Sequence, residues 1–87
     1  MTPAFVEFLG TLLIVGAVAF TSNPLFIVSA VAVAIGLGGK ISGGHFNPAV
    51  TAFQWMSGKM GQSRALMYIL AQLSAAMTVW VLHSSIL

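Results

Sequence analysis

The sequence predicts an all-α membrane protein with three transmembrane helices and one re-entrant half-helix. Hydrophobic residues make up 59% of its 87 residues and charged residues only 5%, whereas soluble domains contain about 25% charged residues. Three long apolar runs are present, and the segment between the last two contains Asn-Pro-Ala and several glycines. A soluble domain of this size would leave much of this apolar surface in water, so lipid is the expected solvent.

The three apolar runs predict the membrane spans of a single domain, residues 1–87, at about 4–20, 25–39 and 65–82. At about 1.5 Å per residue each run is roughly 23–27 Å long, close to the ~30 Å thickness of the hydrocarbon region. A turn at 21–24 separates the first two runs, because it contains Asn-Pro, a strong helix breaker. No Lys or Arg lies near the N-terminus, which argues against a cleaved signal peptide.

The cations are all on one side of this predicted topology. Lys40 follows the second span, and Lys59 and Arg64 precede the third. The positive-inside rule therefore predicts that the N-terminus and the 40–64 connection face the cytoplasm. The expected location is the cell or inner membrane, as a multi-pass integral protein. Three cations are too few for a nucleic-acid-binding face, so the lipid bilayer is the expected partner and nucleic acid is not.

Residues 41–57 form the most informative segment. They are too apolar for an ordinary aqueous loop, and too polar and glycine-rich for a spanning helix. Asn47 is a favoured N-cap and Pro48 suits a first helical position, which predicts a short helix up to about Ser57. Such a helix is roughly 15 Å long, half a bilayer. The segment is therefore predicted to enter the membrane extended and to return as a half-helix.

The composition of this segment favours contact with small neutral solutes. Backbone that is not helical is tolerated at membrane depth only where protein buries it or water lines it. Gly43 and Gly44 permit an extended path whose carbonyl oxygens face a lumen. The half-helix directs the positive end of its dipole, about +0.5 charge, at the bilayer centre, where Asn47 adds a side-chain NH2 donor. Such a site binds water or a hydroxyl group and repels cations, including hydronium.

Three stretches resemble one known family, the aquaporin and glycerol-facilitator, or major intrinsic protein, family. Ile41 to Thr51 (ISGGHFNPAVT) is similar to the first pore loop of that family. Phe5 to Thr11 (FVEFLGT) and Tyr68 to Leu73 (YILAQL) resemble the helices on either side of it. The resemblance covers the whole chain and implies half of an aquaporin-like fold, the N-terminal half.

The resemblance implies a subunit of a passive channel for water or small neutral solutes such as glycerol. It implies that Glu7 anchors the pore loop near His45, the alternative being a transported-proton site. Gln72 is expected to tie the third span to loop backbone, the alternative being a polar contact between helices. His45 is interpreted as a structural residue and not a metal ligand, because the sequence has no second ligand cluster. The residues expected to line the pore or contact the solute are Gly43, Gly44, His45, Asn47, Pro48 and Ala49.

The family pattern contains two inverted halves, and this sequence contains one Asn-Pro-Ala half. A second half would come from an antiparallel homodimer or from a complementary partner chain; the chain is otherwise a truncated product that conducts nothing. The one-sided cations argue against the homodimer. Val50 stands where the second motif of the family usually has Arg, so the choice between water and glycerol stays open.

Two other classes of function are alternatives to a channel. One is a non-conducting or regulatory membrane protein that binds longer channels. The other is a small proton-coupled exporter that uses Glu7, although it leaves residues 41–56 unexplained. An enzyme is not expected, since the sequence offers no nucleophile–base pair, no carboxylate pair and no phosphate-binding loop. No cofactor, metal or catalytic residue is expected.

Overall fold

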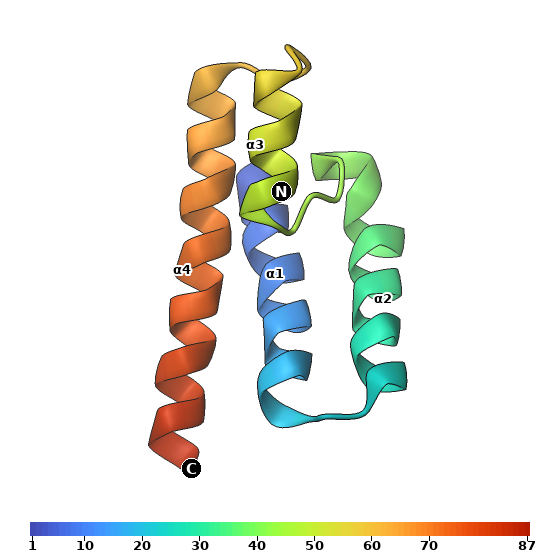
Figure 1. Ribbon diagram of the computed structural model, residues 1–87, viewed down its shortest axis with the longest axis vertical. Helices are drawn as coiled ribbons and strands as arrows, with labels where there is room; N and C mark the ends of the chain where they lie inside the picture. The colour runs from blue at the N-terminus through green and yellow to red at the C-terminus, as the bar shows by residue number, and fades with distance from the viewer.

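The computed structural model describes all 87 residues and contains four helices and no strand (Figure 1). Three helices are long and apolar enough to cross a membrane: α1 (Pro3–Phe20), α2 (Pro24–Ser42) and α4 (Gln62–Ile86). The fourth, α3 (Pro48–Met56), has nine residues and at about 1.5 Å per residue is roughly 14 Å long. The predicted fold class, three spans plus one half-helix, is confirmed.

Proline starts three of the four helices. Each of the three prolines occupies the first helical turn, where its missing N–H costs no hydrogen bond. The side chain before each proline accepts a hydrogen bond from the first turn, and these caps are Thr2, Asn23 and Asn47. Asn23-Pro24 was predicted only to interrupt helical structure; it also begins α2.

Two helices extend beyond the predicted spans. α2 continues to Ser42 where the apolar run ends at residue 39, and α4 covers Gln62–Ile86 where the prediction gave 65–82. Hydropathy detects the stretch that faces lipid, whereas helical hydrogen bonding continues into the more polar residues at either end. Ile41 and Ser42 are therefore helical, and the non-helical part of the re-entrant segment is confined to residues 43–47.

α1 lies between α2 and α4, and α3 packs against α4 (Figure 1). After α2 the chain reverses and runs back toward the middle of the molecule. α3 then begins and runs to the end at which α2 stopped, and a short turn leads into α4 (Figure 1). The segment between α2 and α4 thus enters and leaves at the same end, as a re-entrant segment does.

Small residues bring α1 and α2 together. Ala30, Ala34 and Gly38 form a buried stripe along α2, whereas Ala32 and Gly36 on a neighbouring stripe are exposed. Small side chains allow such close helix approach in lipid. Only 15 of the 87 residues are buried, so most large apolar side chains point outward, where lipid or another protein covers them.

Candidate functional site

The re-entrant turn begins at Gly43, which ends α2. Its φ of 93° is in the left-handed region, which glycine adopts without the steric cost of a Cβ. Its N–H donates to the Gly39 carbonyl at 2.8 Å and closes the last helical turn. Gly44 follows with φ 68°, and a Cβ there would lie 3.4 Å from the Gly39 Cα. Two consecutive glycines therefore let the chain reverse against its own helix.

Glu7 on α1 connects the re-entrant segment to the helices. Its side chain is fully buried, and each carboxylate oxygen accepts two hydrogen bonds. The backbone N–H groups of His45 and Phe46 donate at 3.1 and 2.6 Å. Ser42 Oγ donates at 2.7 Å and Gln72 Nε2 at 2.9 Å. This full set of donors offsets the cost of removing a carboxylate from water.

Thr51 on α3 extends this group of polar contacts. Its Oγ1 accepts a hydrogen bond from Gln72 Nε2 at 2.9 Å and is hydrogen-bonded to His45 Nδ1 at 2.8 Å. Gln72 was expected to bind loop backbone, but its amide instead joins the side chains of Glu7 and Thr51. Because Glu7 and Thr51 both accept hydrogen bonds from Gln72 Nε2, the orientation of the amide is fixed. Gln72 Oε1 is then buried without a hydrogen-bond partner.

Tyr68 on α4 contacts the end of α2. Its hydroxyl donates to the Ser42 carbonyl at 2.5 Å and accepts from Arg64 at 3.0 Å. The His45 ring packs edge-on against the Tyr68 ring, with centroids 5.1 Å apart. We use the name Glu7 network for the group formed by Glu7, Ser42, His45, Thr51, Tyr68 and Gln72.

Three members of the Glu7 network were not singled out as site residues in the sequence: Ser42, Thr51 and Tyr68. Each lies inside a stretch that carries the family resemblance, and that was the signal available. Nothing local distinguishes a buried Ser or Thr hydroxyl from an exposed one. Each of the three also has a partner on another helix, so its role appears only when the chain is folded.

Asn47 lies at the exposed N-terminus of α3. Its Oδ1 accepts a hydrogen bond from the Ala49 N–H at 2.8 Å, while its NH2 has no hydrogen-bond partner in the protein. The first turn of a helix also has backbone N–H groups without intrahelical partners. The start of α3 is thus an exposed group of donors at the positive end of a helix dipole.

The residues expected to line a pore lie on one continuous stretch, 43–49, with the buried Glu7 network behind it. Glu7 and Gln72, the two residues predicted to anchor this stretch, are both buried, with 0% and 1% of their surface exposed. The exposed members of the stretch are Gly43, Asn47 and Ala49, and the half-buried ones are Gly44, His45 and Pro48.

Phe46 is the residue of this stretch that was assigned no role from the sequence. It is buried, with 7% of its surface exposed, and belongs to the apolar core with Val6 and Ala34. Its φ of 51° is in the left-handed region, which costs a residue with a Cβ about 1–2 kcal/mol. The N–H bond to Glu7 and the buried ring compensate for this cost. A phenylalanine before Asn-Pro-Ala in the sequence does not indicate a left-handed backbone conformation.

Three apolar helices with a half-helix between them define a multi-span integral membrane protein with a re-entrant segment. The family described as major intrinsic protein matches residues 2–86. The chain belongs to this family.

The curated relatives are aquaporins or uptake facilitators by name. A glycerol uptake facilitator protein of Streptococcus pneumoniae is 37% identical, covering 88% of this chain and 40% of that protein. Aquaporin TIP1-1 of Zea mays is 39% identical, covering 80% of this chain and 36% of its own length. This chain therefore spans less than half the length of the relatives it matches. No solved structure gives a significant match.

Proposed function

We propose that this chain is a subunit of a passive transmembrane channel for water or small neutral solutes such as glycerol. The observation that carries the proposal is the free NH2 group of Asn47 at the exposed start of α3. A water or hydroxyl oxygen that reaches this point accepts a hydrogen bond that no protein group takes. The names of the relatives, aquaporin and glycerol uptake facilitator, agree with this class of solute.

The charge distribution supports selection against cations. Glu7 is the only acidic residue of the chain, and it is fully buried with four donors around it. The exposed start of α3 therefore presents donors and a positive dipole end, with no carboxylate to attract a cation. A neutral solute with an oxygen acceptor is the ligand that fits.

The Glu7 network supports an anchoring role for Glu7 in preference to proton transport. A transported-proton site requires access from water, whereas Glu7 is enclosed and both of its oxygens are engaged. Through the N–H groups of His45 and Phe46, Glu7 fixes the backbone that leads directly to Asn47. Gln72 and Thr51 attach the same network to α4 and α3.

In this proposal the pore is completed by a second half, supplied by an antiparallel second copy or by a complementary partner chain. One half-helix and three spans do not enclose a lumen, and transporters of this kind place their sites between inverted repeats. The outward-facing apolar side chains provide surface for such a partner as well as for lipid.

Osmotic shrinkage of liposomes tests the proposal, measured by stopped-flow light scattering with this chain alone and with a coexpressed second half. We expect faster water or glycerol flux than in empty liposomes. Asn47→Asp keeps the capping oxygen but replaces the NH2 donors with a second oxygen, so flux of neutral solute falls and cation leak rises. Asn23→Asp is the matched control, since Asn23 caps α2 through the same Asn-Pro arrangement far from the site.

Two results would contradict the proposal. One is equal flux in protein-containing and empty liposomes, with or without a coexpressed second half. The other is an equal change of flux in the two aspartate variants, because a general effect of added charge would then explain the loss.

A further inference from the structure

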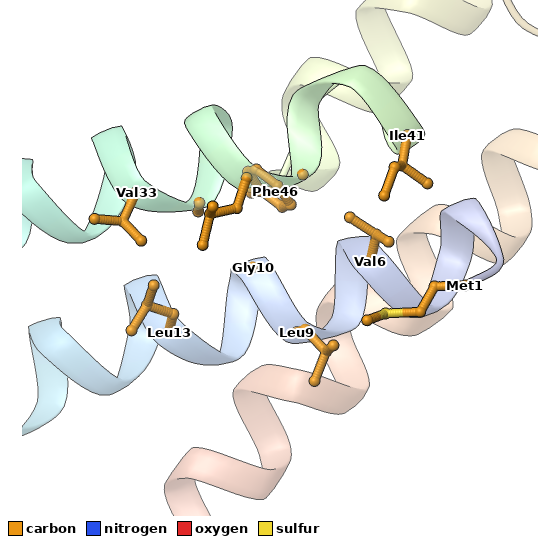
Figure 2. Close-up of a pocket in the computed structure, with 11 residues that line it drawn as sticks. Met1, Val6, Leu9, Gly10, Leu13, Val33, Ile41 and Phe46 are labelled. Atoms are coloured by element: carbon orange, nitrogen blue, oxygen red, sulfur yellow. The ribbon is translucent and has the colours of Figure 1, made fainter.

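The re-entrant backbone contacts α1 twice through one residue, Phe46. Glu7 and Gly10 are three residues apart on α1 and so share a face of the helix. Glu7 accepts the Phe46 N–H, and Gly10 lies against the Phe46 ring, so that a Cβ on Gly10 would overlap ring atoms Cε1, Cδ1 and Cζ. Figure 2 shows Phe46 between α1 and α2, with Gly10 opposite the ring.

On its other side, the Phe46 ring packs against α2. A Cβ on Gly38 would lie 2.7 Å from Val6 Cγ1 and 3.3 Å from Phe46 Cζ. Both glycines are buried. The ring therefore occupies the space that a side chain on Gly10 would fill, and it lies in close contact with Gly38 on the other helix. An ordinary residue at Gly10 would move the ring, and the ring would move the backbone that carries it.

We propose that Phe46 is a positioning residue for the solute site: its ring, packed between Gly10 and Gly38, sets the depth at which Asn47 and the start of α3 lie. Phe46 is joined directly to Asn47, about 3.8 Å away between Cα atoms. The Asn47 side chain bonds only to its own helix, so it adds no contact that would fix this depth. An effect of Phe46 on solute selection rests on the proposed channel function. The effect of Phe46 on the depth of Asn47 does not depend on that function.

A filling role for Phe46 makes a different prediction. The ring forms part of the wall of an apolar groove of ≈ 230 Å³ between α1 and α2, and a side chain that only fills space between these helices contributes to stability alone. Its loss would then reduce the number of folded molecules and lower all fluxes in proportion. A positioning residue changes the place of Asn47, and with it the ratio of glycerol to water permeability in the molecules that are folded.

The geometry is measured with two spin labels, because the chain has no cysteine of its own. Labels at Phe53→Cys on α3 and Leu25→Cys at the start of α2 use exposed positions. Their separation, measured by double electron–electron resonance in bilayers, reports the depth of α3. The variants are Gly10→Ala, Phe46→Ala and the double variant. Gly16→Ala is the matched control, a glycine of α1 whose added Cβ would contact nothing.

We expect Gly10→Ala to shift the mean label distance, and Gly16→Ala to leave it unchanged. In the Phe46→Ala background, adding Gly10→Ala produces no further shift, because the overlapping ring is gone. Contacting residues show this kind of non-additivity. A label distance that is the same in all variants overturns the proposal, and so do equal shifts by Gly10→Ala with and without the ring.

Permeability of the unlabelled variants is the second measurement. Phe46→Ala is expected to change the glycerol-to-water ratio per inserted molecule, and proportional loss of both fluxes contradicts the positioning role. If the wild-type chain inserts but conducts nothing, either alone or with a coexpressed second half, the channel proposal fails, and the label distances alone then decide whether Phe46 positions α3. The two proposals thus fail through different results.

Discussion

At the scale of single residues, Glu7 explains how a carboxylate is tolerated inside a membrane helix. Ionisable side chains in spans are costly and usually have a partner. The partners here are four donors, and no cation is among them. Two of the donors are backbone N–H groups that the non-helical path would otherwise leave unpaired in a dry interior. The Glu7 side chain thus obtains its own hydrogen-bond donors and also provides acceptors for the re-entrant backbone.

Glu7→Gln is expected to destabilise the protein. A carboxamide offers one acceptor oxygen, and its NH2 faces two donors that previously bonded to the second oxygen. We expect a loss of about 2–4 kcal/mol in the free energy of unfolding, because each buried donor left unpaired costs about 1–3 kcal/mol. Titration with denaturing detergent, followed by circular dichroism, measures this loss.

Ser85→Ala is the control for Glu7→Gln. The Ser85 hydroxyl is exposed and bonds only to the Val81 carbonyl of its own helix. We expect its effect to be within about 0.5 kcal/mol, as at most surface positions. Similar losses in the two variants would show that Glu7 is not the anchor that its contacts indicate.

The partners of Glu7 mark the limit of prediction from sequence at this scale. The resemblance pointed to Glu7 and to the region of His45, and Asn47 was evident as a helix cap. Ser42 and Gln72 lie 35 and 65 residues away from Glu7 along the chain, so no local pattern connects them to it. Gln72 was therefore assigned to loop backbone, although a carboxylate and a hydroxyl take both of its N–H groups.

At the scale of helices, the two small-residue stripes of α2 differ in environment. Ala34 is 5% exposed and belongs to the core with Val6 and Phe46, while Ala32 is exposed. The spacing of the small residues does not indicate which of the two stripes faces α1, because small residues are also common on lipid-facing surfaces. Which face of α2 is buried depends on the helices that pack against it.

Ala34→Leu and Ala32→Leu form a matched pair that tests this assignment. Extra methylenes in a packed interior cost about 1–3 kcal/mol, so Ala34→Leu is expected to lower the free energy of unfolding by that amount. Ala32→Leu enlarges an exposed side chain and is expected to change it by less than about 0.5 kcal/mol. The same detergent titration compares them, and a larger loss at residue 32 would mean that the other stripe faces α1.

Helix ends were the least predictable features at this scale. The start of α3 was clear, because Asn47-Pro48 combines a cap with a first-turn proline. The end of α2 was predicted too early, since its last turn contains Lys40 and Ser42, which do not belong to an apolar run. That end is set by the left-handed Gly43, and hydropathy carries no information about φ.

At the scale of the whole molecule, the charges are asymmetric. Lys40 lies in the last turn of α2, Lys59 follows α3 and Arg64 lies in the first turn of α4. The end of α2, the end of α3 and the start of α4 lie toward the same end of the molecule as the N-terminus (Figure 1). The opposite end, with the turn at 21–23 and the C-terminus, has no Lys or Arg. We therefore propose that the N-terminus and the 57–64 connection face the cytoplasm, in accordance with the positive-inside rule.

This proposal predicts a single orientation, which labelling of single cysteines measures. Ser22→Cys and Ser63→Cys place exposed thiols at opposite ends of a chain that has no cysteine. In intact cells a membrane-impermeant maleimide is expected to label residue 22 only, and residue 63 only after permeabilisation. Such a result means that a second, inverted half is not a copy of residues 1–87, because all copies of them point the same way. Comparable labelling of both residues in intact cells would instead indicate dual orientation, and an antiparallel pair of identical chains would then be the assembly that closes the pore.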